Sequence, residues 1–119
     1  MAKVIGIVGT RSRDTEADLE KVKDAFLKVY EEGDTICSGL CSRGADRFAV
    51  IFARLYNTPT IWHPAEWNKY GRGAGFRRNF YIARDSDVLI ACVAKNRAGG
   101  TEDTIRKYLV MGKSKLMLV

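Results

Sequence analysis

The sequence is poor in cysteine, proline and histidine, with three, two and one of them among 119 residues. An odd number of cysteines without the spacing of a secreted framework indicates reduced thiols, as in a cytoplasmic protein. Cys37 and Cys41 lack a second ligand pair, so we expect no metal site. No apolar run approaches the ~18 residues of a membrane span, and no signal peptide is visible, so we expect no membrane association.

Two nucleotide-binding fingerprints are also missing. The motif G-x-G-x-x-G does not follow the first apolar run, and G-x-x-x-x-G-K-[ST] occurs nowhere. These absences argue against an ordinary dinucleotide-binding domain and against a P-loop NTPase. We find no convincing Ser-His-Asp arrangement, and we interpret His63 as structural.

The composition that remains is typical of a globular domain, with 46% hydrophobic and 29% charged residues. A chain of this length predicts a single domain over residues 1–119, large enough to fold without disulfides. The net charge is +6, and the excess is concentrated in residues 41–80, which carry seven basic and two acidic side chains. Such a balance favours an anionic ligand or a nucleic acid as partner.

Short apolar runs alternate with helical periods along the whole chain. The pattern predicts strands at 3–8, 35–38, 60–63, 87–94 and 115–119, and helices at 15–32, 43–56, 76–84 and 99–111. Thr15 and Asp18 resemble a capping box, and the stretch 65–75 is the least regular. Alternating strands and helices predict an α/β fold, a Rossmann-like doubly wound parallel sheet of five strands in the order 3-2-1-4-5.

Glycine and hydroxyl side chains gather after three of the predicted strands. The loops 9–14, 38–46 and 98–103 all fall at the carboxyl edge of the sheet, beside its switch point. Glycine lets backbone amides approach an anion, and a helix N-terminus adds partial positive charge. With the hydroxyls of Thr10, Ser38 and Thr101, these loops predict a cradle for a phosphate or ribose phosphate. The alternative is that the glycines only serve tight turns.

A fourth stretch, 66–79, interleaves glycine, aromatic and arginine residues. Such loops stack on bases and hold phosphates, although a solvated basic loop whose Trp67 and Phe76 fill the core is the alternative. The roles of two acidic residues near these loops also have alternatives. We interpret Glu102 as a ribose ligand or a general acid/base, and Asp46 as a ribose ligand or a first-turn helix acid.

These stretches resemble the SLOG superfamily, Rossmann-like proteins that include DNA-processing protein A and the LOG phosphoribohydrolases. Residues 4–11 look like the superfamily's opening, and 38–46 resemble the S-G-x-A-x-G-x-D stretch of DNA-processing protein A. Arg78 and Asn79 stand where LOG enzymes have the Arg-Lys of M-H-x-R-K-x-x-M, and residues 99–101 are similar to P-G-G-x-G-T. The stretch 64–79 is most similar to a small branch of the superfamily.

The resemblance implies a nucleotide or nucleotide-derived ligand at the carboxyl edge of the sheet. Whether the protein is a sensor or hydrolyses an N-glycosidic bond stays open, and the alternative is a single-stranded nucleic-acid-binding protein. We also expect a homo-oligomer, with Phe52, Tyr56 and Phe80 facing a partner, and no cofactor. For hydrolysis the candidate catalytic residues are Glu102 and Arg78. Together with the loops above, the candidate ligand-binding residues are Gly9, Thr10, Arg11, Ser38, Gly39, Gly44, Asp46, Glu66, Arg72, Arg78, Asn79, Gly99, Gly100 and Thr101.

Overall fold

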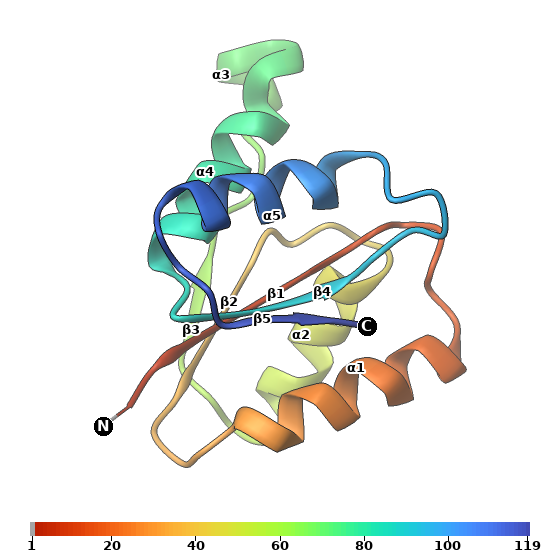
Figure 1. Cartoon of the computed structure of the whole chain (residues 1–119), viewed down its shortest axis with the longest axis vertical. Helices are drawn as coiled ribbons and strands as arrows, with labels where there is room; N and C mark the ends of the chain where they lie inside the picture. Colours follow the sequence, from red (N-terminus) through yellow and green to blue (C-terminus); the bar gives the residue numbers. More distant parts are fainter. Residues whose placement is uncertain (1) are drawn as a thin grey trace.

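The structure, a computed structural model, describes residues 2–119 and contains a sheet of five parallel strands (Figure 1). The strands lie in the order β3-β2-β1-β4-β5, as the sequence predicted. Central β1 pairs with β2 on one side and β4 on the other, so Gly6 lies between Cys37 and Leu89. The strands are β1 (Val4–Gly9), β2 (Thr35–Ser38), β3 (Thr60–Trp62), β4 (Val88–Cys92) and β5 (Leu116–Leu118).

Helices cover both faces of the sheet. Helices α1 (Glu16–Val29) and α2 (Ala45–Leu55) lie on one face, and α4 (Ala74–Asp85) and α5 (Gly100–Val110) lie on the other (Figure 1). The stretch left irregular by the sequence holds a short helix, α3 (Trp67–Tyr70), and a 3-10 turn, η1 (Gly71–Gly73), which lead into α4. Helix α2 begins two residues later than predicted, because Gly44 is its N-cap with a φ of +76°.

The capping box at the start of α1 is present. The Thr15 hydroxyl accepts from the Asp18 amide at 3.1 Å, and the Asp18 carboxylate accepts from the Thr15 amide at 3.3 Å. Arg13 donates to the same carboxylate and also to the carbonyls of Val93 and Val119. The loop after β1 is therefore fastened to the segment that follows β4.

Two apolar clusters lie on the two faces of the sheet, because successive strand side chains point in opposite directions. Ile5 and Ile7 face α1 and α2, where Phe26 stacks on Phe52 with ring centroids 5.3 Å apart. Phe52 is fully buried in this cluster, so the expectation that it faces a partner is wrong.

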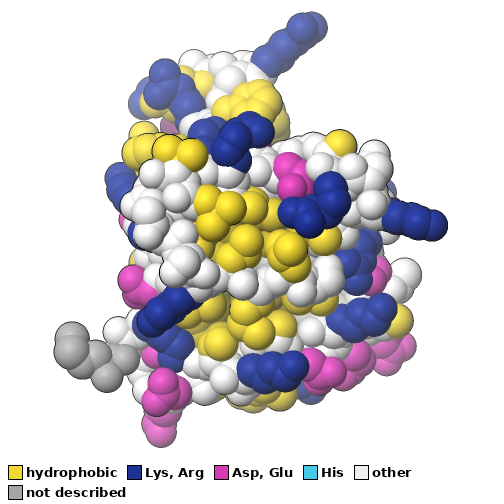
Figure 2. All heavy atoms as spheres, viewed as in Figure 1, with side chains coloured by type: hydrophobic (Ala, Val, Ile, Leu, Met, Phe, Trp, Pro, Cys, Tyr) yellow, Lys and Arg dark blue, Asp and Glu magenta, His cyan; other side chains and the backbone are white. Residues whose placement is uncertain are grey.

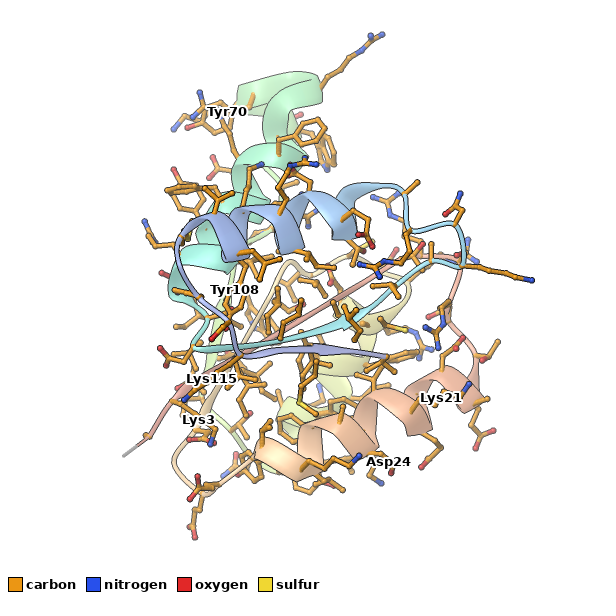
Figure 3. The ribbon with its side chains drawn as sticks, viewed as in Figure 1. Lys3, Lys21, Asp24, Tyr70, Tyr108 and Lys115 are labelled. Atoms are coloured by element: carbon orange, nitrogen blue, oxygen red, sulfur yellow. The ribbon has the colours of Figure 1, made fainter. Side chains whose placement is uncertain are left out.

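The second cluster is closed by Tyr108 of α5, which is fully buried (Figure 3). Its ring packs with Ile82 and Leu89, and its hydroxyl donates to the carbonyls of Asp87 at 2.7 Å and Lys115 at 3.0 Å. One side chain thus connects α5 to the beginnings of both β4 and β5.

Apolar side chains also reach the surface on the α4–α5 side. Figure 2 shows them gathered over α5 and β5, with lysine and arginine around them. Trp67 and Phe76 are 53% and 58% exposed, so the interpretation that they fill the core is wrong. Within residues 2–119, none of the helices has the length and apolar character that crossing a membrane requires. The exposed apolar side chains of α4 and α5 include Phe76, Phe80, Leu109 and Val110.

A buried carboxylate joins the beginnings of β1 and β2. Asp34 accepts hydrogen bonds from the Lys3 amide at 2.9 Å, the Lys3 ammonium at 2.6 Å and the Glu31 amide at 2.8 Å. Burial acts to raise the pKa of Asp34, but the bonds from Lys3 and Glu31 outweigh it and hold that pKa below its usual range.

We expect Asp34→Asn to lower the free energy of unfolding at pH 7 by about 1–3 kcal/mol, because it removes a charge-assisted network. The Asp34 contribution is complete above the ordinary pKa of 3.8 and is lost as the pH falls through the lower folded value. The variant should therefore lose part of the acid dependence of stability. Urea unfolding between pH 7 and pH 3, with exposed Glu32→Gln as control, measures both effects; equal stability of Asp34→Asn and parent at pH 7 would contradict them.

Candidate functional site

A pocket of about 310 Å³ opens at the carboxyl edge of the sheet, between the loops that follow β1 and β4. This is the switch point of the sheet, where folds of this class bind ligands. Four segments form its wall: the end of β1, the approach to α2, the inner face of α4 and the first turn of α5. The lining residues are Val8, Gly9, Thr10, Arg11, Cys41, Asp46, Arg78, Asn79, Ile82, Ala98, Gly99, Gly100, Thr101 and Thr104.

We call this cavity the switch-point pocket. It brings together most of the residues that the sequence indicated, from all three glycine-containing loops. Whether they bind a ligand stays a prediction. The candidate residues that line the pocket are Gly9, Thr10, Arg11, Asp46, Arg78, Asn79, Gly99, Gly100 and Thr101.

Close backbone packing fixes the floor of the pocket at Gly9. A Cβ atom there would lie 2.7 Å from the Cβ of Ala45 and 2.9 Å from that of Cys92, so only glycine lets α2 sit directly on β1. The Thr10 amide donates to the Cys92 carbonyl at 2.9 Å, which extends the strand pairing into the loop. Arg11 follows with an exposed side chain, and no acid of residues 2–119 forms an ion pair with it.

Asp46 is buried in the first turn of α2. Its carboxylate accepts from the Ser38 hydroxyl at 3.1 Å and from the Cys41 amide at 3.0 Å, and it lies 3.9 Å from Arg78. Burial raises the pKa of Asp46, although these three neighbours oppose the effect. The bonds to Ser38 and Cys41 hold the loop after β2 in shape, so Asp46 acts at least partly as a structural acid.

Arg78 reaches from α4 across the mouth of the pocket. Its guanidinium donates to the Gly39 carbonyl at 3.1 Å and to the Asn79 side-chain oxygen at 3.1 Å. Asn79 is buried and in turn donates to the Gly100 carbonyl at 3.2 Å and to the Asp103 carboxylate at 3.1 Å. These bonds hold α4, the loop after β2 and the start of α5 in one relative position.

The first turn of α5 faces the pocket without a side-chain cap. Gly99 is its N-cap with a φ of +106°, and no atom lies within 4 Å of where its Cβ would be. The first amides of a helix have no partner within it, and they carry partial positive charge. Together with Thr101, this turn presents donors to whatever occupies the pocket.

The other candidate residues lie elsewhere. Ser38 is buried and donates to the Ile7 carbonyl at 2.6 Å, so its hydroxyl does not face the pocket. Glu102 does not line it either and is held by Arg97 at 2.8 and 3.0 Å. Outside the pocket wall lie Ser38, Gly39, Gly44, Glu66, Arg72 and Glu102.

Sequence reasoning missed several lining residues, among them Cys41, Ile82 and Thr104. Ile82 had a detectable signal, since it lies one helical turn after Arg78 on the same face. The left-handed backbone of Leu40 (φ +57°) and Arg97 (φ +53°), in the loops beside the pocket, had none.

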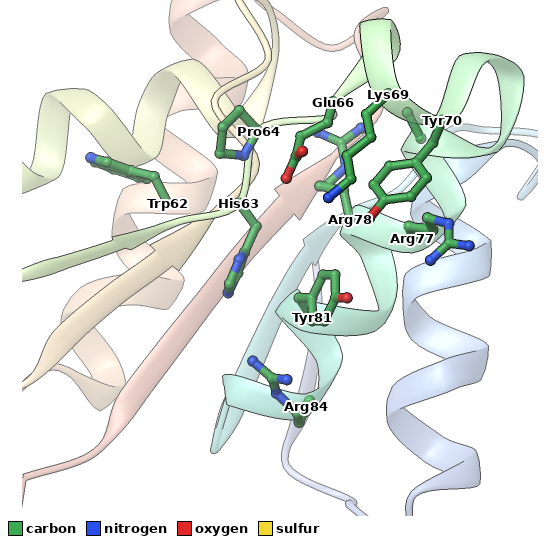
Figure 4. A pocket seen from close by; sticks show the side chains of 11 residues that line it. Trp62, His63, Pro64, Glu66, Lys69, Tyr70, Arg77, Arg78, Tyr81 and Arg84 are labelled. Carbon is green, nitrogen blue, oxygen red and sulfur yellow. The ribbon is translucent and has the colours of Figure 1, made fainter.

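A second cavity, of about 390 Å³, lies on the other side of Arg78 (Figure 4). We call it the aromatic pocket. The Arg77 guanidinium stacks 4.1 Å from the Tyr70 ring centroid, and that of Arg84 lies 4.9 Å from the Tyr81 ring centroid. Its lining residues are Trp62, His63, Pro64, Glu66, Lys69, Tyr70, Ala74, Arg77, Arg78, Tyr81 and Arg84.

No protein-family model and no curated protein sequence matches the chain. Among solved structures, the chain is similar to a molybdenum cofactor binding protein from the phototrophic bacterium Rippkaea orientalis. The TM-score is 0.77 at 23% sequence identity, and the match covers 99% of this chain and 76% of the other. This likeness shows a shared fold, and membership of the SLOG superfamily stays a prediction.

We expect Gly44→Ala to destabilise the fold more than the matched change Gly112→Ala. Both glycines have a positive φ, +76° and +83°, so each substitution carries a backbone strain of about 1–3 kcal/mol. Only at Gly44 would the new Cβ lie 2.5 Å from the Thr10 carbonyl oxygen, in the loop that borders the switch-point pocket. Chemical denaturation of both variants measures the difference, and equal losses would contradict the close approach.

Proposed function

We propose that the protein binds a nucleotide or nucleotide-derived ligand in the switch-point pocket, through its phosphate. The observation that carries this proposal is the meeting of three groups of donors around one cavity: Arg11, Arg78 and the uncapped first turn of α5. A guanidinium grips a phosphate with paired hydrogen bonds, and a helix N-terminus adds backbone donors of the same polarity. The pocket's size suits one nucleotide better than two.

The surroundings favour binding over hydrolysis as the function. A hydrolase of N-glycosidic bonds needs a carboxylate beside the ribose. Asp46 is the carboxylate that lines the pocket among residues 2–119, and Ser38 and Cys41 already bind it. Glu102 is turned to Arg97, outside the pocket wall. We therefore propose a binding protein or sensor, and catalysis by Glu102 and Arg78 stays a hypothesis.

The fold neighbour adds a second ligand class to the test. It is named for binding the molybdenum cofactor, and a similar fold with a cavity at the switch point is compatible with a small cofactor here too. The molybdenum cofactor therefore belongs in the same assay as the nucleotides. Its binding in place of them would keep the pocket as the site and replace the ligand.

We expect a mononucleotide such as AMP to bind once per chain, and adenosine, which lacks the phosphate, to bind more weakly. Arg78→Lys should weaken AMP binding by about 1–3 kcal/mol, roughly 5- to 150-fold in Kd, because an ammonium cannot reproduce a two-point grip. Arg77→Lys is the control, since Arg77 lies on the same helix but outside this pocket. Isothermal titration calorimetry measures the affinities of the parent for AMP and adenosine, and those of the two variants for AMP.

Arg78 also has bonds within the protein, so melting curves accompany the titrations. Unchanged AMP affinity in Arg78→Lys, together with a melting temperature several degrees lower, would make Arg78 structural. Its partners would then be Gly39 and Asp46. Asp87, an acid shortly after α4 that could have paired with Arg78, instead accepts from the Val4 amide at 2.8 Å. The absence of binding by every nucleotide in a panel would contradict the proposal itself.

Single-stranded nucleic acid is the second candidate, favoured by the aromatic pocket. Lys69, Arg77, Arg78 and Arg84 line it against one acid, Glu66, with tyrosine and tryptophan rings between them. Salt separates the two candidates in the same titrations. The affinity for an oligonucleotide falls steeply as salt rises, because each phosphate contact releases counterions, whereas the affinity for one nucleotide changes little.

We further propose that the chain self-associates through the exposed apolar side chains of α4 and α5, which include Phe80 and Val110.

Two other expectations from the sequence, a single domain over residues 1–119 and a cytoplasmic location, stay predictions.

Light scattering after size exclusion, at micromolar concentration, should give a mass of at least twice 13.3 kDa. Val110→Glu, at a position 80% exposed on α5, should shift the mass toward the monomer, because it places a charge in the contact. Leu55→Glu, 61% exposed on the opposite face of the sheet, is the control and should not. A parent species of 13.3 kDa would contradict self-association.

A further inference from the structure

Three side chains of metal-binding type meet beside the aromatic pocket, whose wall includes His63. Cys37 lies on β2, His63 directly follows β3, and Asp85 is the last residue of α4. One ligand atom from each, the thiol sulfur, a ring nitrogen and a carboxylate oxygen, lies within 4.8 Å of the other two. His63 lies on the wall of the pocket, with its ring centroid 5.6 Å from that of Tyr81 (Figure 4).

We propose that Cys37, His63 and Asp85 form a binding site for a transition-metal dication, with Zn²⁺ as the best match. Thiolate, imidazole and carboxylate together are a zinc-type donor set, whereas Mg²⁺ and Ca²⁺ take oxygen ligands. Three protein ligands leave the fourth tetrahedral position free for water or an outside ligand. The proposal is independent of the nucleotide proposed for the switch-point pocket.

The spacing of the three donors is close to what zinc requires. Bond lengths of about 2.0–2.3 Å place two ligands of a tetrahedral zinc roughly 3.3–3.7 Å apart. The His63 Nε2 and Asp85 Oδ2 atoms are 2.6 Å apart, so they would move apart by about 1 Å. The sulfur would close in by a similar amount. When the metal binds, the Cys37 thiol loses its proton to solvent, and His63 Nε2 gives up the proton that it donates to Asp85, so that the neutral ring carries its proton on Nδ1.

The neighbours hold Asp85 in a suitable orientation. The Arg84 guanidinium donates to Asp85 Oδ1 at 2.9 Å and to Oδ2 at 3.4 Å, and Oδ2 also lies 2.6 Å from His63 Nε2. Lys113 donates to the carbonyls of Ala83, Arg84 and Ser86 at 2.7 to 2.9 Å and so fixes the last turn of α4.

Two of the three side chains are partly open to solvent, and one of them, His63, lines the aromatic pocket. The His63 and Asp85 side chains are 20% and 21% exposed, whereas Cys37 is fully buried. A metal bound here would therefore be closed off on the Cys37 side, and its free coordination position would lie on the partly exposed side of His63 and Asp85.

A nucleophilic cysteine is the competing interpretation of the same three residues, and the surroundings of Cys37 argue against it. Cys37 is fully buried, so an outside electrophile does not reach its sulfur. A buried structural cysteine of this kind is inert as a nucleophile. The other alternative is that His63 and Asp85 only form an ion pair that fastens β3 to α4.

Cobalt is the probe that separates these interpretations. The full chain, kept reduced without added thiols, is titrated with Co²⁺ and followed by absorption. We expect one Co²⁺ per chain, with a thiolate-to-cobalt charge-transfer band and tetrahedral visible bands that Zn²⁺ abolishes. The parent's melting temperature should rise with Zn²⁺ and return to its first value with a chelator.

The variants assign the ligands. Cys37→Ala should lose the charge-transfer band, and His63→Gln and Asp85→Asn should each weaken Co²⁺ binding at least about tenfold. Cys92→Ala removes another buried thiol outside the cluster, and Cys41→Ser removes the remaining cysteine; both should keep the band. If Cys37→Ala fails to fold, the Co²⁺ affinities of His63→Gln and Asp85→Asn still test the proposal. No band in the parent, a band that survives in Cys37→Ala, or unchanged affinity in Asp85→Asn would overturn the proposal.

Discussion

The position of β1 between β2 and β4 is the constraint on which the rest of the structure depends. The chain leaves β1 on one face to reach β2 and later returns to β4 on the other side. The loops after β1 and β4 therefore separate toward opposite faces, and a gap remains between them. Every polar group of the switch-point pocket comes from an element that borders this gap. The pairing of Gly9 with Cys92 sets how narrow its floor is.

Small residues and buried polar bonds make this arrangement rigid. Gly9 and Gly44 let α2 approach the first loop within backbone contact, and Asn79 joins α4 to the start of α5. Arg78 and the first turn of α5 are consequently held in position, whereas Arg11 is exposed. Preorganisation of the first two would lower the entropy cost of the binding that we propose, because they have little freedom left to lose. Among these donors, Arg78 has a long side chain that lines both the switch-point pocket and the aromatic pocket.

The sequence predicted the sheet order because five short apolar segments alternate with segments of helical periodicity, as in a parallel α/β sheet. It also placed the loops of Gly9, Ser38 and Gly99 near one another, since parallel strands end at the same edge, whereas Arg78 became a candidate through the resemblance to LOG enzymes. It did not distinguish Thr10, whose loop borders the pocket, from Ser38, whose hydroxyl turns into the core to meet Ile7. That choice depends on a side-chain rotamer and on neighbours 31 residues away, which a linear pattern does not contain. For the same reason the sequence showed no ligands near Cys37 beyond Cys41 and predicted no metal site, whereas folding brings Cys37 close to His63 and Asp85.

The connection of β1 to β4 also determines when the pocket comes into existence during folding. The Val4 amide bonds to Asp87 across 83 residues, and Arg13 bonds to Val119 across 106. Loop closure over such distances is entropically costly, and chains dominated by these contacts fold slowly. A partly folded chain with only β1, α1 and β2 in place has one side of the gap and no cavity. The switch-point pocket is thus a property of the finished fold, and the ligand that we propose for it could bind a nascent chain only after β4 has docked.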